Sequence, residues 1–328
     1  MPQNLITDVA GVRVGHADNP VAATGVTVVV FDRRVIASGD IRGGGAGTRE
    51  TDQLDPAMTV EKIDAITLSG GSAFGLDAAS GVQAWLREQG RGFAMREALV
   101  PIVPSAILFD LLNGGDKKWG RYPPYRELGY SAAFAADRDF ALGSAGAGLG
   151  ALTLNLKGGI GSASATLGDI TVGALTAVNP AGSVTVGDSA QFWAAPFEQN
   201  KEFGGRGFPQ YVPAEALTPR TRGSTSTNTT LSIVATDAIL TKAQARFVSI
   251  MAQDGIARAV YPVHTPLDGD SVFVASTGAL PLGNTIFDLM RLGALAANVV
   301  ARSIARAVYE ADPLPFAGAL PAYKHKFR

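Results

Sequence analysis

Apolar runs alternate with short polar or glycine-rich segments along most of the chain. Runs of four to nine residues that are rich in β-branched side chains are typical of buried strands. Such runs predict strands at residues 26–31, 65–68, 152–156, 170–178, 183–186, 230–236 and 272–275.

Three segments place apolar residues at helical spacing instead. They predict helices over residues 72–89, from residue 241 onward, and over residues 285–310. Strands and helices are mixed along the chain without strict βαβ alternation and without an internal repeat. This order favours an α+β fold in which sheets lie between helices. Since no shift in composition marks a boundary, we expect residues 1–328 to form a single domain.

The helix that begins near residue 241 carries a specific start signal. Thr241 and Gln244 have the spacing of a capping box, in which each side chain bonds the other residue's backbone N–H. The apolar residues that follow predict a buried helix face made of Phe247, Ile250 and Met251.

Composition narrows the function. Hydrophobic residues make up 46% of the 328 and charged residues 17%, as in a compact globular protein. The 28 Lys and Arg residues balance 29 Asp and Glu residues, which argues against a nucleic-acid groove. The N-terminus lacks the pattern of a signal peptide, and the long uncharged stretches contain many Gly and polar residues. We therefore expect a soluble cytoplasmic protein with neither a nucleic-acid nor a membrane partner.

The rarest residue types exclude several chemistries. The chain has no cysteine, which excludes thiolate nucleophiles, iron–sulfur clusters and thiolate zinc sites. Its three histidines, His16, His264 and His325, have no metal-ligand spacing and leave few candidates for a Ser-His-Asp triad. We expect neither a metal nor a cofactor.

Two glycine-rich motifs are poor matches to known signatures. Residues 70–75 (GGSAFG) would place Ser72 in a nucleophile elbow, but Phe74 stands where that motif has glycine. The motif is better interpreted as a helix N-cap at Ser72, or as close packing between the strand and the helix. Residues 146–150 (GAGLG) fail the dinucleotide fingerprint because residue 151 is alanine, so these are turn glycines.

A polar loop runs directly into a buried strand at Asn228–Thr229. Residues 191–227 are irregular in pattern and end in the polar stretch 222–227, while the strand predicted at 230–236 follows. A threonine at such a junction can attack the preceding carbonyl and release itself as a new N-terminus. Its α-amine, with a pKa near 8, can then serve as the base for its own hydroxyl. Residues 228–230 also form a glycosylation sequon, but that interpretation is excluded because no secretory signal accompanies it. A plain junction between loop and strand is the remaining alternative.

Asp268 and Asp270 stand just before the strand predicted at 272–275. Two acids at i and i+2 share one face of an extended segment. Taken alone, the pair is more simply a turn with solvated acids, and the calcium-loop pattern is incomplete.

Taken together, six ordered blocks resemble the P1-family peptidases. These are self-processing N-terminal-nucleophile hydrolases that include D-aminopeptidases, β-peptidyl aminopeptidases and 6-aminohexanoate-oligomer (nylon) hydrolases. The resemblance covers nearly the whole chain and implies an αββα-like sandwich. The blocks are IRGGGAGTRETD at 41–52, LSGGSAFGLD at 68–77, NLKGGIG at 155–161, VNP at 178–180, NTT at 228–230 and DGD at 268–270.

The resemblance implies a role for each matching residue. Thr229 matches the nucleophile, freed by cleavage of the Asn228–Thr229 bond into fragments 1–228 and 229–328. Lys157 matches a lysine whose charge lowers the pKa of the new α-amine, and Asn179 matches the amide that donates to the oxyanion. Asp268 and Asp270 match the acids that orient the nucleophile.

The Asn-Thr and Asp-Gly-Asp sequences are similar to the nylon-oligomer branch, which implies linear oligoamide substrates and a homotetramer. An aminopeptidase is the alternative within the family, and a catalytically degenerate oligomeric scaffold is the non-enzyme alternative. Phe109 stands where that branch has a tyrosine near the oxyanion, so the resemblance implies that one hydroxyl donor is missing. Phe109 and Ser72 are both assigned to the substrate pocket.

Overall fold

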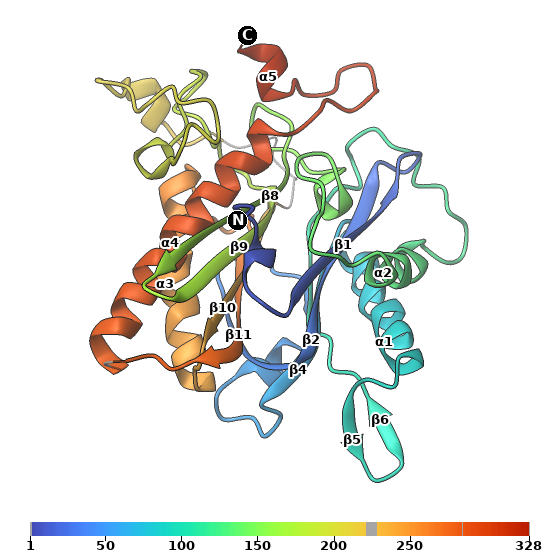
Figure 1. Cartoon of the computed structure of the whole chain (residues 1–328). Coiled ribbons are helices and arrows are strands. Elements are labelled where there is room, and N and C mark those ends of the chain that lie inside the picture. The colour runs from blue at the N-terminus through green and yellow to red at the C-terminus, as the bar shows by residue number, and fades with distance from the viewer. Residues whose placement is uncertain (1, 221–227, 284, 328) are drawn as a thin grey trace.

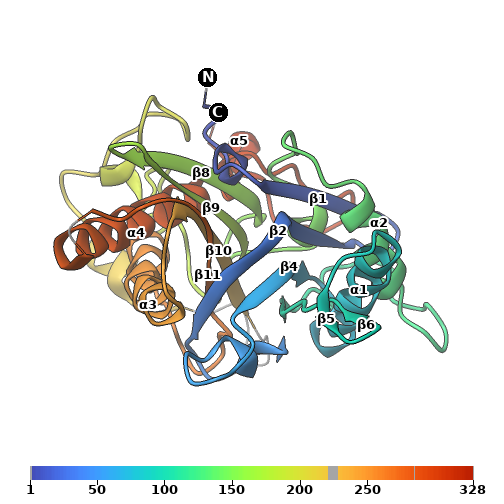
Figure 2. The same cartoon turned by 60° about the horizontal axis from the view of Figure 1, so that its bottom comes forward.

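The computed structural model describes residues 2–220, 228–283 and 285–327. The chain forms two β-layers packed face to face, with a pair of helices outside each layer (Figures 1 and 2). Helices α1 and α2 cover one side, and α3 and α4 cover the other. The predicted α+β class and its αββα layering are confirmed.

One mixed sheet supplies both β-layers, and β2 (Thr24–Ile41) connects them. Residues 24–31 of β2 pair with β1 (Val12–Asn19), whereas residues 36–41 pair with β11 (Ser271–Leu280). The path of the sheet is β3-β7-β4-β2-β11-β10-β9-β8. Its other strands are β3 (Thr48–Arg49), β4 (Lys62–Ser69), β7 (Ser105–Ile107), β8 (Gly159–Leu167), β9 (Ile170–Asn179) and β10 (Thr229–Ala238).

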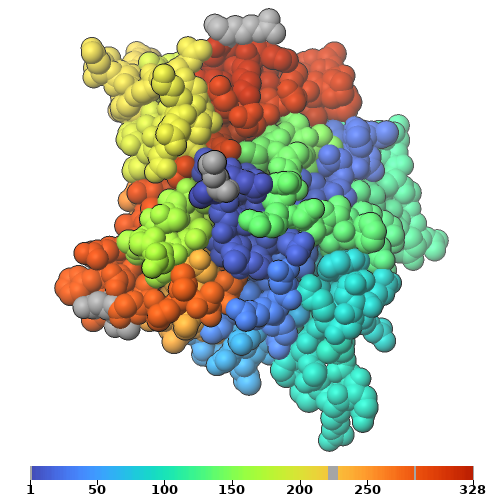
Figure 3. All heavy atoms as spheres, in the orientation of Figure 1, coloured from blue at the N-terminus to red at the C-terminus, as the bar shows by residue number. Residues whose placement is uncertain are grey.

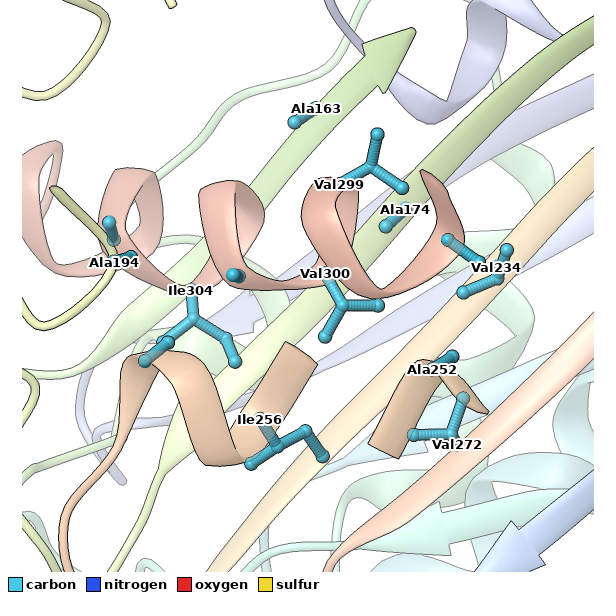
Figure 4. Close-up of a cluster of buried hydrophobic side chains, with 14 of the residues drawn as sticks. Ala163, Ala174, Ala194, Val234, Ala252, Ile256, Val272, Val299, Val300 and Ile304 are labelled. Carbon is cyan, nitrogen blue, oxygen red and sulfur yellow. The ribbon is translucent and has the colours of Figure 1, made fainter. Parts of the chain in front are cut away.

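Three hydrophobic clusters fill the spaces between the four layers. The inner cluster joins Phe31 of β2 to Leu231 and Ile233 of β10. A second cluster lies beneath α1 and α2. The third packs α3 and α4 onto the outer face of the sheet, where Val234 and Val272 meet the helices (Figure 4). Because side chains alternate along a strand, β10 contributes to the clusters on both of its faces.

The helices and the small hairpin complete the fold. The hairpin projects as an arm from the lower edge of the molecule (Figure 3). No helix in the described ranges has the length and apolarity that crossing a membrane requires. The helices are α1 (Ala78–Glu88), α2 (Tyr125–Phe134), α3 (Lys242–Ala259), α4 (Thr285–Tyr309) and α5 (Tyr323–Lys326), and the hairpin strands are β5 (Phe93–Met95) and β6 (Ala98–Val100).

Most predicted elements are confirmed, but two predicted strands are wrong. Residues 152–156 form a turn, in which Leu152 and Lys157 make one isolated bridge and the hydroxyl of Thr153 bonds the backbone of Leu156. Residues 183–186 likewise make only isolated bridges. The part of the predicted loop at 222–227 lies outside the described residues.

The predicted start of the first helix is also wrong. A 3-10 helix over Ser72–Asp77 precedes α1, so Ser72 is not its N-cap. Ser72 itself has a φ of +52°, a left-handed conformation that differs from the extended one typical of an N-cap.

Helix α3 begins as predicted but buries a different face. Thr241 accepts a hydrogen bond from Gln244 N–H, which confirms the capping box. Phe247 and Ile250, however, are 52% and 37% exposed. The buried face carries smaller side chains that allow close approach to the sheet and to α4, namely Ala245, Val248, Ala252 and Ile256.

Strand β8 had no strong sequence signal because it is rich in small residues. A Cβ atom at Gly161 would lie 2.0 Å from the carbonyl oxygen of Ser303 on α4. The absence of a side chain at Gly161 therefore lets the long helix lie directly on this strand.

Candidate active site

Four adjacent strands begin or end at the same edge of the sheet. Strand β9 ends at Asn179, while β8, β10 and β11 begin at this edge. The pairing of β9 is antiparallel to both β8 and β10, and β10 is parallel to β11. This topology gathers Lys157, Asn179, Thr229 and the Asp268–Asp270 segment, which are far apart in the sequence.

Thr229 and Asn179 lie opposite each other on the adjacent strands β10 and β9. They are direct partners in the antiparallel register of β9 and β10, and both are buried. The Asn179 side chain is held at both ends, because its Oδ1 accepts from Leu152 N–H at 2.9 Å and its Nδ2 donates to Phe109 O at 3.2 Å. An amide nitrogen carries two hydrogens, so Asn179 retains one for an oxyanion.

The Asn228–Thr229 peptide is buried and firmly held. Asn228 N–H donates to Leu267 O at 2.9 Å, and Gly269 N–H donates to Asn228 O at 2.9 Å. The hydroxyl of Thr229 also donates to Asn228 O, at 2.5 Å. The carbonyl group that the Thr229 hydroxyl would attack during self-cleavage thus accepts a hydrogen bond from an N–H group and lies beside that hydroxyl. Such a donor stabilises the negative charge that develops there.

Lys157 is buried directly before β8. Its Nζ donates to Gly148 O at 2.8 Å and to Gly158 O at 2.9 Å. Burial lowers the pKa of Lys157 to about 7, although the negative charges of Asp110 and Asp312 oppose this shift. At neutral pH the amine therefore exists in both the charged and the neutral form.

Asp268 anchors the loop that leads into β11. Its carboxylate accepts from Ala181 N–H at 3.0 Å and from the N–H and hydroxyl of Thr265 at 3.0 and 2.6 Å. Burial, with the nearby charge of Asp270 as a second cause, raises the pKa of Asp268. The residue holds together two loops, one after β9 and one before β11.

Asp270 contacts the strand of the candidate nucleophile. One carboxylate oxygen accepts from Thr230 N–H at 2.7 Å, and the other lies 2.8 Å from His264 Nδ1. Both acids are buried, so the alternative of a turn with solvated acids is wrong.

The glycine-rich block at 41–52 supports this acid loop through its backbone. Gly45 N–H donates to Asp268 O at 2.8 Å, and Gly44 N–H donates to Thr265 O at 3.3 Å. Gly43 has a φ of +87°, and a Cβ atom there would lie 2.2 Å from Asp268 O. Only glycine permits this approach between the two motifs.

The block at 68–77 supports the segment that carries Phe109. Gly71 N–H donates to Asp110 at 2.8 Å, and Ser72 N–H donates to Leu108 O at 3.0 Å. Asp110 is buried, which raises its pKa. Phe109 therefore meets Asn179 through its carbonyl oxygen, and Ser72 lies next to the same segment.

Sequence reasoning missed three contributors to this site: His264, Asp110 and the N–H of Leu152. His264 carries no sequence signal for a contact with Asp270, because a spacing of six residues between these two residue types is no recognised motif. In the part of the chain that the structure describes, no three His, Asp or Glu side chains are grouped to hold a metal ion.

A family model described as peptidase family S58 matches residues 4–319. The chain belongs to peptidase family S58. The resemblance found in the six blocks is therefore confirmed, and this S58 member is a hydrolase that acts on amide or peptide bonds.

Relatives within the family have two kinds of name. An uncharacterized aminopeptidase of Mycobacterium tuberculosis strain H37Rv is 43% identical over 99% of this chain and 98% of its own length. A 6-aminohexanoate-oligomer endohydrolase of Kocuria sp. strain KY2 is 28% identical over 91% of this chain and 84% of its own length.

Solved structures of two aminopeptidases have the same fold. A Burkholderia sp. β-aminopeptidase superposes with a TM-score of 0.71, covering 99% of this chain and 92% of its own, at 22% identity. The L-aminopeptidase D-Ala-esterase/amidase from Ochrobactrum anthropi, described as a variant of the Ntn hydrolase fold, gives 0.70 at 19% identity, covering 98% and 91%.

Proposed function

We propose that this S58 member is a self-processing amide hydrolase whose nucleophile is Thr229. Cleavage of the Asn228–Thr229 bond would convert the precursor into fragments 1–228 and 229–328 within one domain. The supporting observation is the buried Asn228–Thr229 peptide, whose carbonyl oxygen accepts from Gly269 N–H and from the Thr229 hydroxyl.

Self-processing is an N-to-O acyl shift followed by hydrolysis. The Thr229 oxygen attacks the carbonyl carbon of Asn228, and the C–N bond breaks as the hydroxyl proton passes to the departing nitrogen. The resulting ester takes up one water, which releases the Asn228 carboxyl group and regenerates the Thr229 hydroxyl beside a free α-amine. Gly269 N–H, which donates to Asn228 O, would stabilise the oxyanion of the first step.

Turnover then uses the new α-amine as the base for the Thr229 hydroxyl. The charged form of Lys157 would lower the pKa of that amine and keep more of it neutral. Asn179 Nδ2 would donate to the oxyanion of the bound amide. Asp268 and Asp270 would hold the flanking loop and the nucleophile strand in place.

We propose linear oligoamides such as 6-aminohexanoate oligomers as substrates. The Asn-Thr cleavage site and the Asp268–Asp270 pair support this class, as do relatives named 6-aminohexanoate-oligomer endohydrolases. Release of N-terminal D-, L- or β-amino acids is the second candidate, favoured by the 43% identity to relatives named aminopeptidases.

A substrate panel separates the two candidates. Processed enzyme is incubated with 6-aminohexanoate oligomers and with D-, L- and β-amino-acid amides, and the products are resolved by mass spectrometry. The Thr229→Ala variant serves as the blank. Turnover confined to amino-acid amides would reject the oligoamide proposal, and equal hydrolysis by wild type and the blank would reject Thr229 as the nucleophile.

We also propose that the processed enzyme is a homo-oligomer, with the tetramer as the expected state. Large apolar side chains are exposed on α3, at the start of α4 and directly after β10. They are Ile239, Phe247, Ile250, Ile286, Phe287 and Met290. Apolar surface of this kind is typical of interfaces between copies of a chain.

A further inference from the structure

His264 lies in the loop between α3 and β11 with an unfavourable backbone conformation. Its φ is +51°, in the left-handed region that non-glycine residues rarely adopt. This conformation directs two donors at one oxygen, because the backbone N–H lies 3.2 Å and the ring Nδ1 2.8 Å from Asp270 Oδ2.

The other ring nitrogen reveals a second unfavourable feature. His264 Nε2 is buried and has no hydrogen-bond partner among the described residues. The contact of Nδ1 with a carboxylate favours the tautomer in which Nδ1 carries the hydrogen. A strained backbone and an unsatisfied buried atom, in one residue beside a reactive centre, indicate a conformation that is maintained for function.

The contact continues from Asp270 to the nucleophile strand. Asp270 Oδ1 accepts from Thr230 N–H at 2.7 Å, and Thr230 directly follows Thr229. The backbone of Asp270 is itself fixed, since Arg42 N–H donates to its carbonyl oxygen at 2.7 Å. With only 2% of its side chain exposed, Asp270 has little solvent to hold its carboxylate in this orientation.

We propose that His264 is a positioning residue of the active site. It orients the Asp270 carboxylate, which in turn fixes the Thr230 N–H and the start of β10 on which Thr229 is carried. This role rests on the proposed function of Thr229 as the nucleophile. His264 touches neither the substrate nor the reacting atoms in this role, so it acts only through Asp270.

The test compares three substitutions by kcat and KM, with rates normalised to the amount of processed enzyme. His264→Ala removes the ring donor and should lower kcat about tenfold with KM within about twofold, since small displacements of a reacting group reduce rates strongly. His264→Asn retains an N–H donor and tolerates a positive φ, so it should recover kcat to within about threefold of wild type. His325→Ala, an exposed histidine in α5, is the matched control and should not differ from wild type.

A double-mutant cycle shows whether His264 acts through Asp270. In an Asp270→Ala background, His264→Ala should cause no further loss. If His264→Ala fails to fold, His264→Gly replaces it, because glycine removes the side chain and relieves the backbone strain.

Several outcomes would overturn the proposal: kcat of His264→Ala within twofold of wild type, Asn as impaired as Ala, or additive losses in the cycle. If any of these outcomes occurs while Thr229→Ala is inactive, only the role of His264 is rejected and the proposed function of Thr229 stands. Full activity of Thr229→Ala would instead reject the proposed function.

Discussion

Asn179, the last residue of β9, lies directly opposite Thr229, the first residue of β10, in the antiparallel register of the two strands. A register shift of one residue would turn one of the two side chains to the other face of the sheet. The inner hydrophobic cluster prevents that shift, because Leu231 of β10 and Ala177 of β9 must stay buried in it. Strand pairing therefore places the candidate oxyanion donor opposite the candidate nucleophile, which is fifty residues away in sequence.

Removal of the Thr229 hydroxyl should abolish self-processing. We expect wild-type protein to give fragments 1–228 and 229–328 on a denaturing gel and Thr229→Ala to remain one full-length band. Thr230→Ala is the matched control, because that neighbouring hydroxyl is buried without a partner in the described structure. It should process normally. Wild-type protein that stays as one band after long incubation would refute the mechanism.

Loss of the Asn179 amide should impair turnover without moving its pH dependence. An oxyanion donor acts on the transition state and does not titrate, so Asn179→Ala should lower kcat by ~10²–10³-fold at every pH. Asn298→Ala removes a comparable amide on α4 that bonds Arg258, and it should leave kcat unchanged. A normalised rate for Asn179→Ala within twofold of wild type would show that Asn179 is structural.

Lys157→Met should shift the acidic limb of the pH–rate profile upward by roughly one pH unit. Without the nearby positive charge, the α-amine of Thr229 holds its proton to higher pH and cannot act as a base. The profile is measured on processed enzyme, because we expect the substitution to slow maturation as well. An unchanged limb would mean that Lys157 does not influence the base.

The buried Lys157 should also make stability depend on pH. Its pKa is about 7 in the folded protein against an ordinary 10.5, so the unfolded chain binds more protons between these values. Stability from this residue is complete above 10.5 and is lost as the pH falls toward 7. The free energy of unfolding of Thr229→Ala, minus that of Thr229→Ala/Lys157→Met, should therefore rise across this window by at most about 1.4 kcal/mol per pH unit. Urea titrations at several pH values measure the difference, and a flat difference would contradict the lowered pKa.

Assembly should be visible by light scattering. A single chain has a mass of 33.9 kDa, and we expect a mass near four times that value. Phe287→Asp places a charge within the exposed apolar set on α3 and α4 and should reduce the mass. A monomer mass for dilute wild-type protein would exclude the oligomer. A tetramer that Phe287→Asp leaves intact would place the interface on another surface.

Much of this protein could be predicted from local sequence. Long β-branched runs identified β2, β9 and β10, because burial on both faces leaves few polar positions in such strands. The capping box identified the start of α3, because that signal depends only on residues within one turn. The six motif blocks identified the family and the candidate residues.

Tertiary structure decided what the motifs do and which faces are buried. The predicted face of α3 at Phe247 was wrong because the helix packs through alanine and valine, whose small size matters only against a neighbouring element. Gly43 and Gly44 are required by the close approach of the loop at 265–269, which local sequence cannot reveal. His264 and Asp110 had no motif at all. His264 contacts Asp270 through its backbone N–H and its ring, and Asp110 accepts from Gly71 N–H; these contacts depend on how the chain packs in three dimensions.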